Sequence, residues 1–176
     1  MTQTSLSVSQ PASLSASMSA SVPLLKIGII GSGGLADQWL APAFAGLDGA
    51  CLWSVLSRDI KSATAFAVKH GLKAQQPAFD NIDSFLADPE LDAVIIASPD
   101  TLHASQALAC VKAGKHVLVE KPMTTSSADA QSLIAAAAAA NVRLAVGYHL
   151  RFHAGHRLLR QAIIDGKLGA VRHMDI

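Results

Sequence analysis

The sequence has few cysteines, few aromatic residues and almost no net charge, and these shortages exclude several classes of protein. Its 176 residues include 2 cysteines, which excludes a disulfide-rich secreted scaffold and a four-cysteine zinc site. Its 14 basic and 13 acidic side chains give a formal net charge of +1, so charge does not favour nucleic acid or an anionic membrane as the main partner. No apolar run is long enough for a membrane-spanning helix. We therefore expect a cytoplasmic protein with neither partner.

Aliphatic residues, in contrast, are abundant. Hydrophobic residues make up 51% of the chain and aromatic residues only 5%, a mixture that suits helices packed closely on a sheet. Cys51 and Cys110 both lie in apolar runs, and we expect both to be buried free thiols.

The first residues differ in composition from the rest of the chain. Residues 1–22 contain no charged side chain and are rich in serine, so residues 1–23 are interpreted as a disordered tail. A targeting segment and a start codon assigned too early, with Met18 as the true start, are the alternatives.

Short apolar strands and helical segments alternate from residue 24 to residue 148. This alternation predicts an α/β fold, a doubly wound parallel sheet with helices on both faces and right-handed crossovers. The expected strands are 26–30, 50–56, 76–79, 93–97, 116–119 and 143–147, and the expected helices are 35–47, 60–70, 82–86, 102–113 and 126–140.

The pattern changes after residue 148. A helix is predicted over residues 154–164, and residues 170–176 alternate like the opening strand of another sheet. Residues 149–176 are therefore interpreted as the start of a second, truncated α+β domain used for substrate binding and oligomerisation. Because a last strand without a partner would leave backbone groups unpaired, we expect the chain to be the front part of a longer architecture.

A glycine-rich turn directly follows the first predicted strand and precedes the first predicted helix. It matches G-x-G-x-x-A, a form of the dinucleotide-binding fingerprint. The first glycine permits a tight turn, the second lets a pyrophosphate approach the backbone, and the alanine allows close helix packing, while the helix N-terminus attracts the phosphates. The candidate phosphate-binding residues are Gly31, Ser32, Gly33, Gly34, Leu35 and Ala36.

The end of the second predicted strand suggests which dinucleotide binds. An acidic residue at this place would bind the ribose 2′-hydroxyl of NAD, but the sequence has Ser57 and Arg58. The guanidinium of Arg58 suits a 2′-phosphate, so NADP is favoured over NAD. Alternatively, Arg58 is a solvated loop charge and Asp59 caps the next helix, and both interpretations can hold together.

Two further motifs carry a family resemblance. Residues 97–103 read Ala-Ser-Pro-Asp-Thr-Leu-His, and residues 114–122 read Gly-Lys-His-Val-Leu-Val-Glu-Lys-Pro. With the glycine turn, they resemble the Gfo/Idh/MocA family of glucose–fructose oxidoreductases and inositol dehydrogenases, over residues 24 to about 176. The resemblance implies a two-domain NAD(P)-dependent oxidoreductase acting on CH–OH groups of sugar- or polyol-like substrates. It also implies a homo-oligomer in full-length relatives, which is doubtful for this chain.

The resemblance also implies roles for individual residues. Lys121 is the expected catalytic residue, contacting substrate and nicotinamide ribose and assisting proton transfer. From the sequence alone, Lys121 follows the carboxyl end of a parallel strand, where open α/β sheets bind ligands, although it could equally be a surface lysine. The other residues expected to line the cofactor groove or approach the active site are Ser98, Pro99, His103, Glu120, Pro122 and Arg151.

Family members carry a further catalytic Asp and His beyond the point where this chain stops, so we expect the chain to bind cofactor without being catalytically complete. A non-enzymatic NAD(P)-binding sensor is the alternative function. An S-adenosylmethionine-binding loop is a second rival, which the Glu-Lys-Pro element argues against. The spacing of His149, His153 and His156 allows a shared helix face, but no carboxylate joins them and no metal site is expected.

Overall fold

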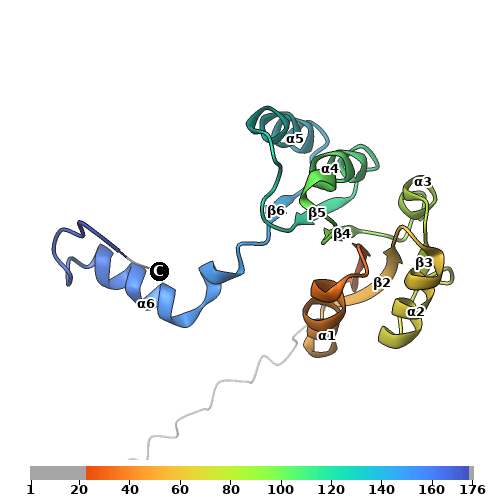
Figure 1. Ribbon diagram of the computed structural model, residues 1–176, viewed down its shortest axis with the longest axis horizontal. Coiled ribbons are helices and arrows are strands. Elements are labelled where there is room, and N and C mark those ends of the chain that lie inside the picture. The colour runs from red at the N-terminus through yellow and green to blue at the C-terminus, as the bar shows by residue number, and fades with distance from the viewer. Residues whose placement is uncertain (1–22, 175–176) are drawn as a thin grey trace, which may run out of the picture.

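Six parallel strands form one sheet in the computed structural model, which describes residues 23–174 (Figure 1). The order across the sheet is β3-β2-β1-β4-β5-β6. The tail predicted over residues 1–23 lies outside the described part except for its last residue. The strands are β1 (Leu25–Ile30), β2 (Ala50–Leu56), β3 (Ala78–Phe79), β4 (Ala93–Ile96), β5 (His116–Val119) and β6 (Leu144–Val146).

Helices cover both faces of this sheet, which confirms the predicted doubly wound α/β fold (Figure 1). One apolar cluster joins the sheet to the first helical segment and to α2 (Ile60–His70). The other joins it to α3 (Ile82–Leu86), α4 (His103–Lys112) and α5 (Ser127–Ala139). Burial of these aliphatic faces on both sides of the sheet is the main driving force for the fold.

The strand order reverses between β1 and β4. The chain runs outward from β1 to β3 and then returns to place β4 against the other side of β1. Ile30 and Ile96, the last residues of the two strands, are register partners. The chain continues from β1 into a helix on one face of the sheet and from β4 into α4 on the other face. This divergence leaves a crevice at the carboxyl ends of the two strands.

The first helix is less regular than predicted. In place of one helix over residues 35–47, the structure has a π-helical turn η1 (Ala36–Leu40), a short α1 (Ala41–Ala43) and a 3₁₀ turn η2 (Phe44–Gly46). Pro42 lies inside this segment and has no backbone N–H, and its ring crowds the carbonyl four residues earlier. The irregular hydrogen bonding follows from this proline.

The other predicted helices begin and end at recognisable signals. Asp59 caps the N-terminus of α2 through its side chain, and Gly71 ends that helix in the left-handed conformation. The side chain of Ser126, one of the two serines predicted for this role, caps α5. Cys110 is buried as predicted, and burial raises the pKa of its thiol to about 12. Cys51 was predicted to be buried but is half-buried, because it lies near the beginning of β2 at the edge of the core.

The segment after β6 leaves the sheet. It forms a 3₁₀ turn η4 (His149–Phe152) and helix α6 (Ala154–Ile164), which extends away from the body of the molecule (Figure 1). The strand predicted over residues 170–176 is wrong for residues 170–174, because no described strand lies beside them to complete a ladder. Within residues 23–174, no helix has both the length and the apolar character needed to cross a membrane.

Candidate functional site

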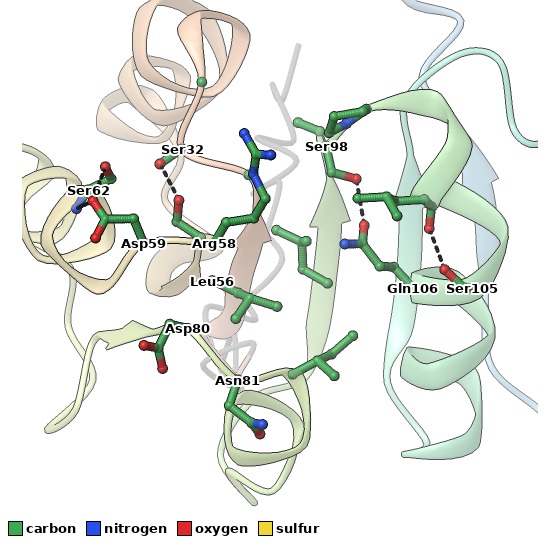
Figure 2. Close-up of a pocket in the computed structure, with 18 of the residues that line it drawn as sticks. Ser32, Leu56, Arg58, Asp59, Ser62, Asp80, Asn81, Ser98, Ser105 and Gln106 are labelled. Carbon is green, nitrogen blue, oxygen red and sulfur yellow. Dashed lines mark hydrogen bonds between the residues drawn. The ribbon is translucent and has the colours of Figure 1, made fainter.

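A cleft of about 950 Å³ opens at the carboxyl ends of the central strands (Figure 2). Its walls come from the turn after β1, the ends of β2 and β3, and the segment that leads from β4 into α4. Of the predicted cofactor-binding residues, it brings together Gly31, Ser32, Gly33, Ser57, Arg58, Ser98 and Pro99.

The glycine turn has the geometry that its sequence predicts. Gly31 has a φ of +103°, and a Cβ atom there would lie 2.7 Å from the carbonyl oxygen of Ala97, so only glycine fits. A Cβ on Gly33 would meet no atom within 4 Å, which leaves room for a ligand beside the backbone. Gly34 and Leu35 are exposed at the start of the helix, whereas Ala36 is fully buried beneath it.

The first helix begins directly at the cleft. The Asp37 amide donates to the Gly33 carbonyl oxygen at 2.9 Å, which closes the first helical turn. The earlier N–H groups of a helix have no acceptor within it, and they carry the positive end of the helix dipole. This end of the helix therefore suits a phosphate group.

The end of β2 is tied to the glycine turn. The Ser32 hydroxyl donates to the Ser57 hydroxyl at 2.9 Å. Figure 2 shows the Arg58 side chain rising between Ser32 and Ser98, and it forms no ion pair with any described carboxylate. The arrangement presents a planar cation at the mouth of the cleft, where it can grip an anionic group.

Asp59 lines the cleft but is already engaged. Its carboxylate accepts hydrogen bonds from the Ser62 hydroxyl at 2.7 Å and from the Ser62 amide at 3.0 Å. The Ser62 hydroxyl contributes most to lowering the pKa of this carboxyl group, followed by the backbone amides of Ser62 and Lys61. The prediction that Asp59 caps the following helix is therefore confirmed.

Several cleft residues were not predicted. Asp80, Asn81 and Ile82 follow the short strand β3, so the rule that identified Ser57 could have identified them too. A further group lies on η3 (Asp100–Leu102) and α4, at spacings of three or four residues that place them on one helix face. The members of this group are Leu102, Ser105, Gln106 and Ala109, and the Ser98 hydroxyl donates to the Gln106 side-chain oxygen at 2.5 Å.

The turn after β5 lies at the same edge of the sheet, beyond the β4 side of the cleft. The Glu120 amide continues the ladder by donating to the Ile96 carbonyl oxygen at 2.9 Å, and the exposed Lys121 follows it. The Glu120 carboxylate packs against Gly147, where a Cβ would come within 2.9 Å of Oε1. Glu120, Lys121 and Pro122 are not among the residues that line the cleft.

Two further predicted site residues, His103 and Arg151, also lie outside the cleft walls. His103 does not line the cleft: its side chain is buried, because α4 begins at this residue and turns the ring inward. Nδ1 lies 2.7 Å from the Pro122 carbonyl oxygen, and Nε2 lies 2.9 Å from the Ser98 carbonyl oxygen. Arg151 is exposed on η4 and is also absent from the cleft walls, so its role stays a prediction.

Among residues 23–174, no three His, Cys, Asp or Glu side chains gather as a metal site.

A parallel sheet with a glycine turn and an open crevice at its strand-order reversal defines a dinucleotide-binding domain of the α/β class. The chain belongs to the Gfo/Idh/MocA family, as the family profile for the "Oxidoreductase family, NAD-binding Rossmann fold" matches residues 25–148. The resemblance noted in the sequence is thereby confirmed.

Several curated relatives of this chain are named as sugar or polyol oxidoreductases. The chain is 34% identical over 142 residues to 1,5-anhydro-D-fructose reductase of Ensifer adhaerens, a match that covers 81% of this chain and 41% of that protein. It is 34% identical to scyllo-inositol 2-dehydrogenase (NADP(+)) IolU of Bacillus subtilis, with 85% of this chain and 44% of that protein covered. The chain thus spans less than half the length of these relatives.

Solved structures with the same fold contain nicotinamide cofactors. KijD10, a 3-ketoreductase from Actinomadura kijaniata in complex with NADP, matches with a TM-score of 0.77 and 29% identity, over 85% of this chain and 46% of that one. Scyllo-inositol dehydrogenase from Lactobacillus casei, with bound NAD(H) and scyllo-inositol, matches with a TM-score of 0.75 and 28% identity, over 83% of this chain and 42% of that one.

Proposed function

We propose that the chain binds NADP(H) in the cleft between β1, β2 and β4. The pyrophosphate would lie against the glycine turn at Gly31–Gly33, where the backbone is open and the first helix begins. The adenosine end would lie between the end of β2 and the side chains of Leu102 on η3 and Gln106 on α4.

The observation that carries the preference for NADP is the pair of residues after β2. Ser57 stands where NAD-specific domains carry an acidic residue, and Arg58 beside it forms no ion pair with a described carboxylate. A guanidinium binds a phosphate through two parallel hydrogen bonds. The relatives support either cofactor, since the KijD10 structure holds NADP and the Lactobacillus casei enzyme holds NAD(H).

The proposed activity is hydride transfer between this cofactor and a CH–OH group of a sugar or polyol, the substrate class that the relatives' names indicate. When bound, the nicotinamide ring supplies or accepts the hydride. Lys121 lies at the edge of the sheet that holds the cleft, and we assign its Nζ the proton that enters or leaves the substrate oxygen.

Turnover needs more than the described residues provide. Lys121 is exposed to water, whereas hydride transfer requires the reacting groups to be held together in a dry site. We propose that a further wall over Lys121 is required for efficient catalysis. A cytoplasmic location is part of the same proposal, and the free thiols Cys51 and Cys110 fit a reducing compartment.

Titration calorimetry with NADPH, NADH and S-adenosylmethionine tests the proposal. The wild-type chain should bind NADPH most tightly and should not bind S-adenosylmethionine. Arg58→Ala should weaken NADPH by about 10- to 100-fold, the loss of charge-assisted hydrogen bonds, and change NADH by less than about twofold.

Arg143→Ala provides the matched control, because this exposed arginine lies just before β6, at the opposite edge of the sheet. It should change neither affinity. Equal losses of NADPH and NADH in Arg58→Ala would refute the 2′-phosphate assignment, and binding of neither nicotinamide cofactor by the wild-type chain would refute the proposed function.

A further inference from the structure

A buried histidine connects the cleft wall to the turn that carries Lys121. His103 is the first residue of α4, and its side chain is only 2% exposed. The ring lies between the segment after β4 and the segment after β5, which are neighbours in the sheet but distant in the sequence.

Both ring nitrogens face backbone acceptors. Nδ1 lies 2.7 Å from the Pro122 carbonyl oxygen, and Nε2 lies 2.9 Å from the Ser98 carbonyl oxygen. A neutral imidazole donates to one such oxygen, and an imidazolium donates to both. The ring therefore spans the two segments at hydrogen-bonding distance from each.

The turn has little else to hold it. Within the described chain, residues 121–125 make one hydrogen bond to another part of the fold, the contact between Pro122 and His103. The remaining polar contacts are local: the Lys121 amide donates to Glu120, and the Thr124 hydroxyl donates to the Ser126 carbonyl oxygen. Met123 adds apolar packing against the core.

We propose that His103 is a positioning residue, which fixes the Lys121–Pro122 turn to the cleft wall at Ser98 and so sets where the Lys121 ammonium stands relative to a bound cofactor. The part of this inference that concerns the cofactor rests on the proposed function. The part that concerns the turn does not, and the two parts are tested separately.

The turn is tested without any ligand, through the ¹³C-methyl resonance of Met123. His103→Ala should shift or broaden this resonance. Val55→Ala opens a cavity in the apolar cluster that does not include Met123, and it controls for general destabilisation by leaving the Met123 resonance in place. An unchanged Met123 signal in His103→Ala would overturn the proposal.

Two closer replacements keep the test decisive if His103→Ala does not fold. An asparagine side-chain amide can donate from near the position of Nδ1, and a glutamine amide from near that of Nε2. His103→Asn should therefore retain the Pro122 contact and a wild-type Met123 signal, whereas His103→Gln should lose both. Identical spectra for the two variants, or the reverse order, would contradict the assignment.

The link to Lys121 is tested by a double-mutant cycle on NADPH affinity. His103→Ala and Lys121→Met should each raise Kd about tenfold, and the double variant should exceed either by less than about twofold, because both remove one interaction. Losses that multiply would show that His103 does not act through Lys121. If the wild-type chain binds no NADPH, the proposed function fails, and the Met123 experiment alone decides the role of His103.

Discussion

The two edges of the parallel sheet use their polar groups in opposite ways. At the edge where the strands begin, the Lys115 ammonium donates to the Asp88 carbonyl oxygen at 2.8 Å, and the Trp53 indole donates to the Asp88 carboxylate at 2.8 Å. Lys26 lies over the Trp53 ring at 4.3 Å and pairs with Glu90. This edge is closed by contacts within the chain.

The edge where the strands end is open. Arg58 has no carboxylate partner among the described residues, Lys121 is exposed, and Gly33 faces free space. One sequence motif reaches both edges, because residues 114–122 run along β5 from Lys115 at its beginning to Lys121 beyond its end. Its first lysine is held by a backbone carbonyl group, and its last is exposed at the edge where the strands end. Substitutions at the two edges should therefore separate stability from binding.

Gly31→Ala should have the largest effect. It should reduce both stability and cofactor binding, because Gly31 is needed for the fold of the turn and also lines the cleft. The substitution combines a φ of +103° with a Cβ 2.7 Å from the Ala97 carbonyl oxygen, and should cost about 2–4 kcal/mol of unfolding free energy. Gly34→Ala, with its nearest contact a flexible Gln38 side chain at 3.8 Å, is the control. Urea unfolding measures the stability of both variants. Equal unfolding free energies for Gly31→Ala and Gly34→Ala would contradict the turn geometry.

Lys115→Met should affect stability alone. It removes the ammonium that satisfies the Asp88 carbonyl oxygen, and we expect a loss of about 1–3 kcal/mol with NADPH affinity unchanged. Lys112→Met, at the exposed end of α4, should change neither quantity. A large loss of NADPH affinity in Lys115→Met would show that the amino edge takes part in binding.

Gly33→Ala should affect binding alone. The added methyl group meets no protein atom within 4 Å, so the melting temperature should hold, but it enters the space proposed for the pyrophosphate. We expect NADPH to bind about tenfold more weakly by calorimetry, the cost of a group wedged between ligand and backbone. An unchanged affinity would show that the pyrophosphate does not bind at this turn.

Ser54→Ala should have the smallest effect. Ser54 lies within β2, between the two edges of the sheet. The Ser54 hydroxyl is fully buried in β2 and has no hydrogen-bond partner among the described residues. Removing an unsatisfied buried group should raise the unfolding free energy by about 1 kcal/mol and leave cofactor affinity unchanged. A loss of stability on urea unfolding would mean that the hydroxyl is satisfied in solution.

Much of this arrangement follows from local signals in the sequence. Apolar runs bounded by glycine and polar residues located all six strands. The dinucleotide fingerprint located Gly31, the rule for the end of the second strand located Ser57, and the family resemblance located Ser98. The rule for strand ends also identifies Asp80 and Asn81, which directly follow the short strand β3.

What the sequence could not predict depends on contacts between distant segments. The burial of His103 requires the turn at Pro122, which lies 19 residues further on. The distortion of the first helix is an exception, because Pro42 acts locally and its position in the sequence could have predicted it. Alternation at residues 170–174 predicted a strand that has no neighbour to pair with.

An amide NMR titration of the chain with NADPH tests the division between the two edges most directly. If only the carboxyl edge binds cofactor, NADPH should shift the amide resonances of Gly31, Ser32, Gly33, Arg58 and Ser98. The amide resonances of Asp88 and Lys115 should not shift. Perturbations centred on Asp88 and Lys115, or a silent Gly31–Gly33 turn at saturating NADPH, would contradict it.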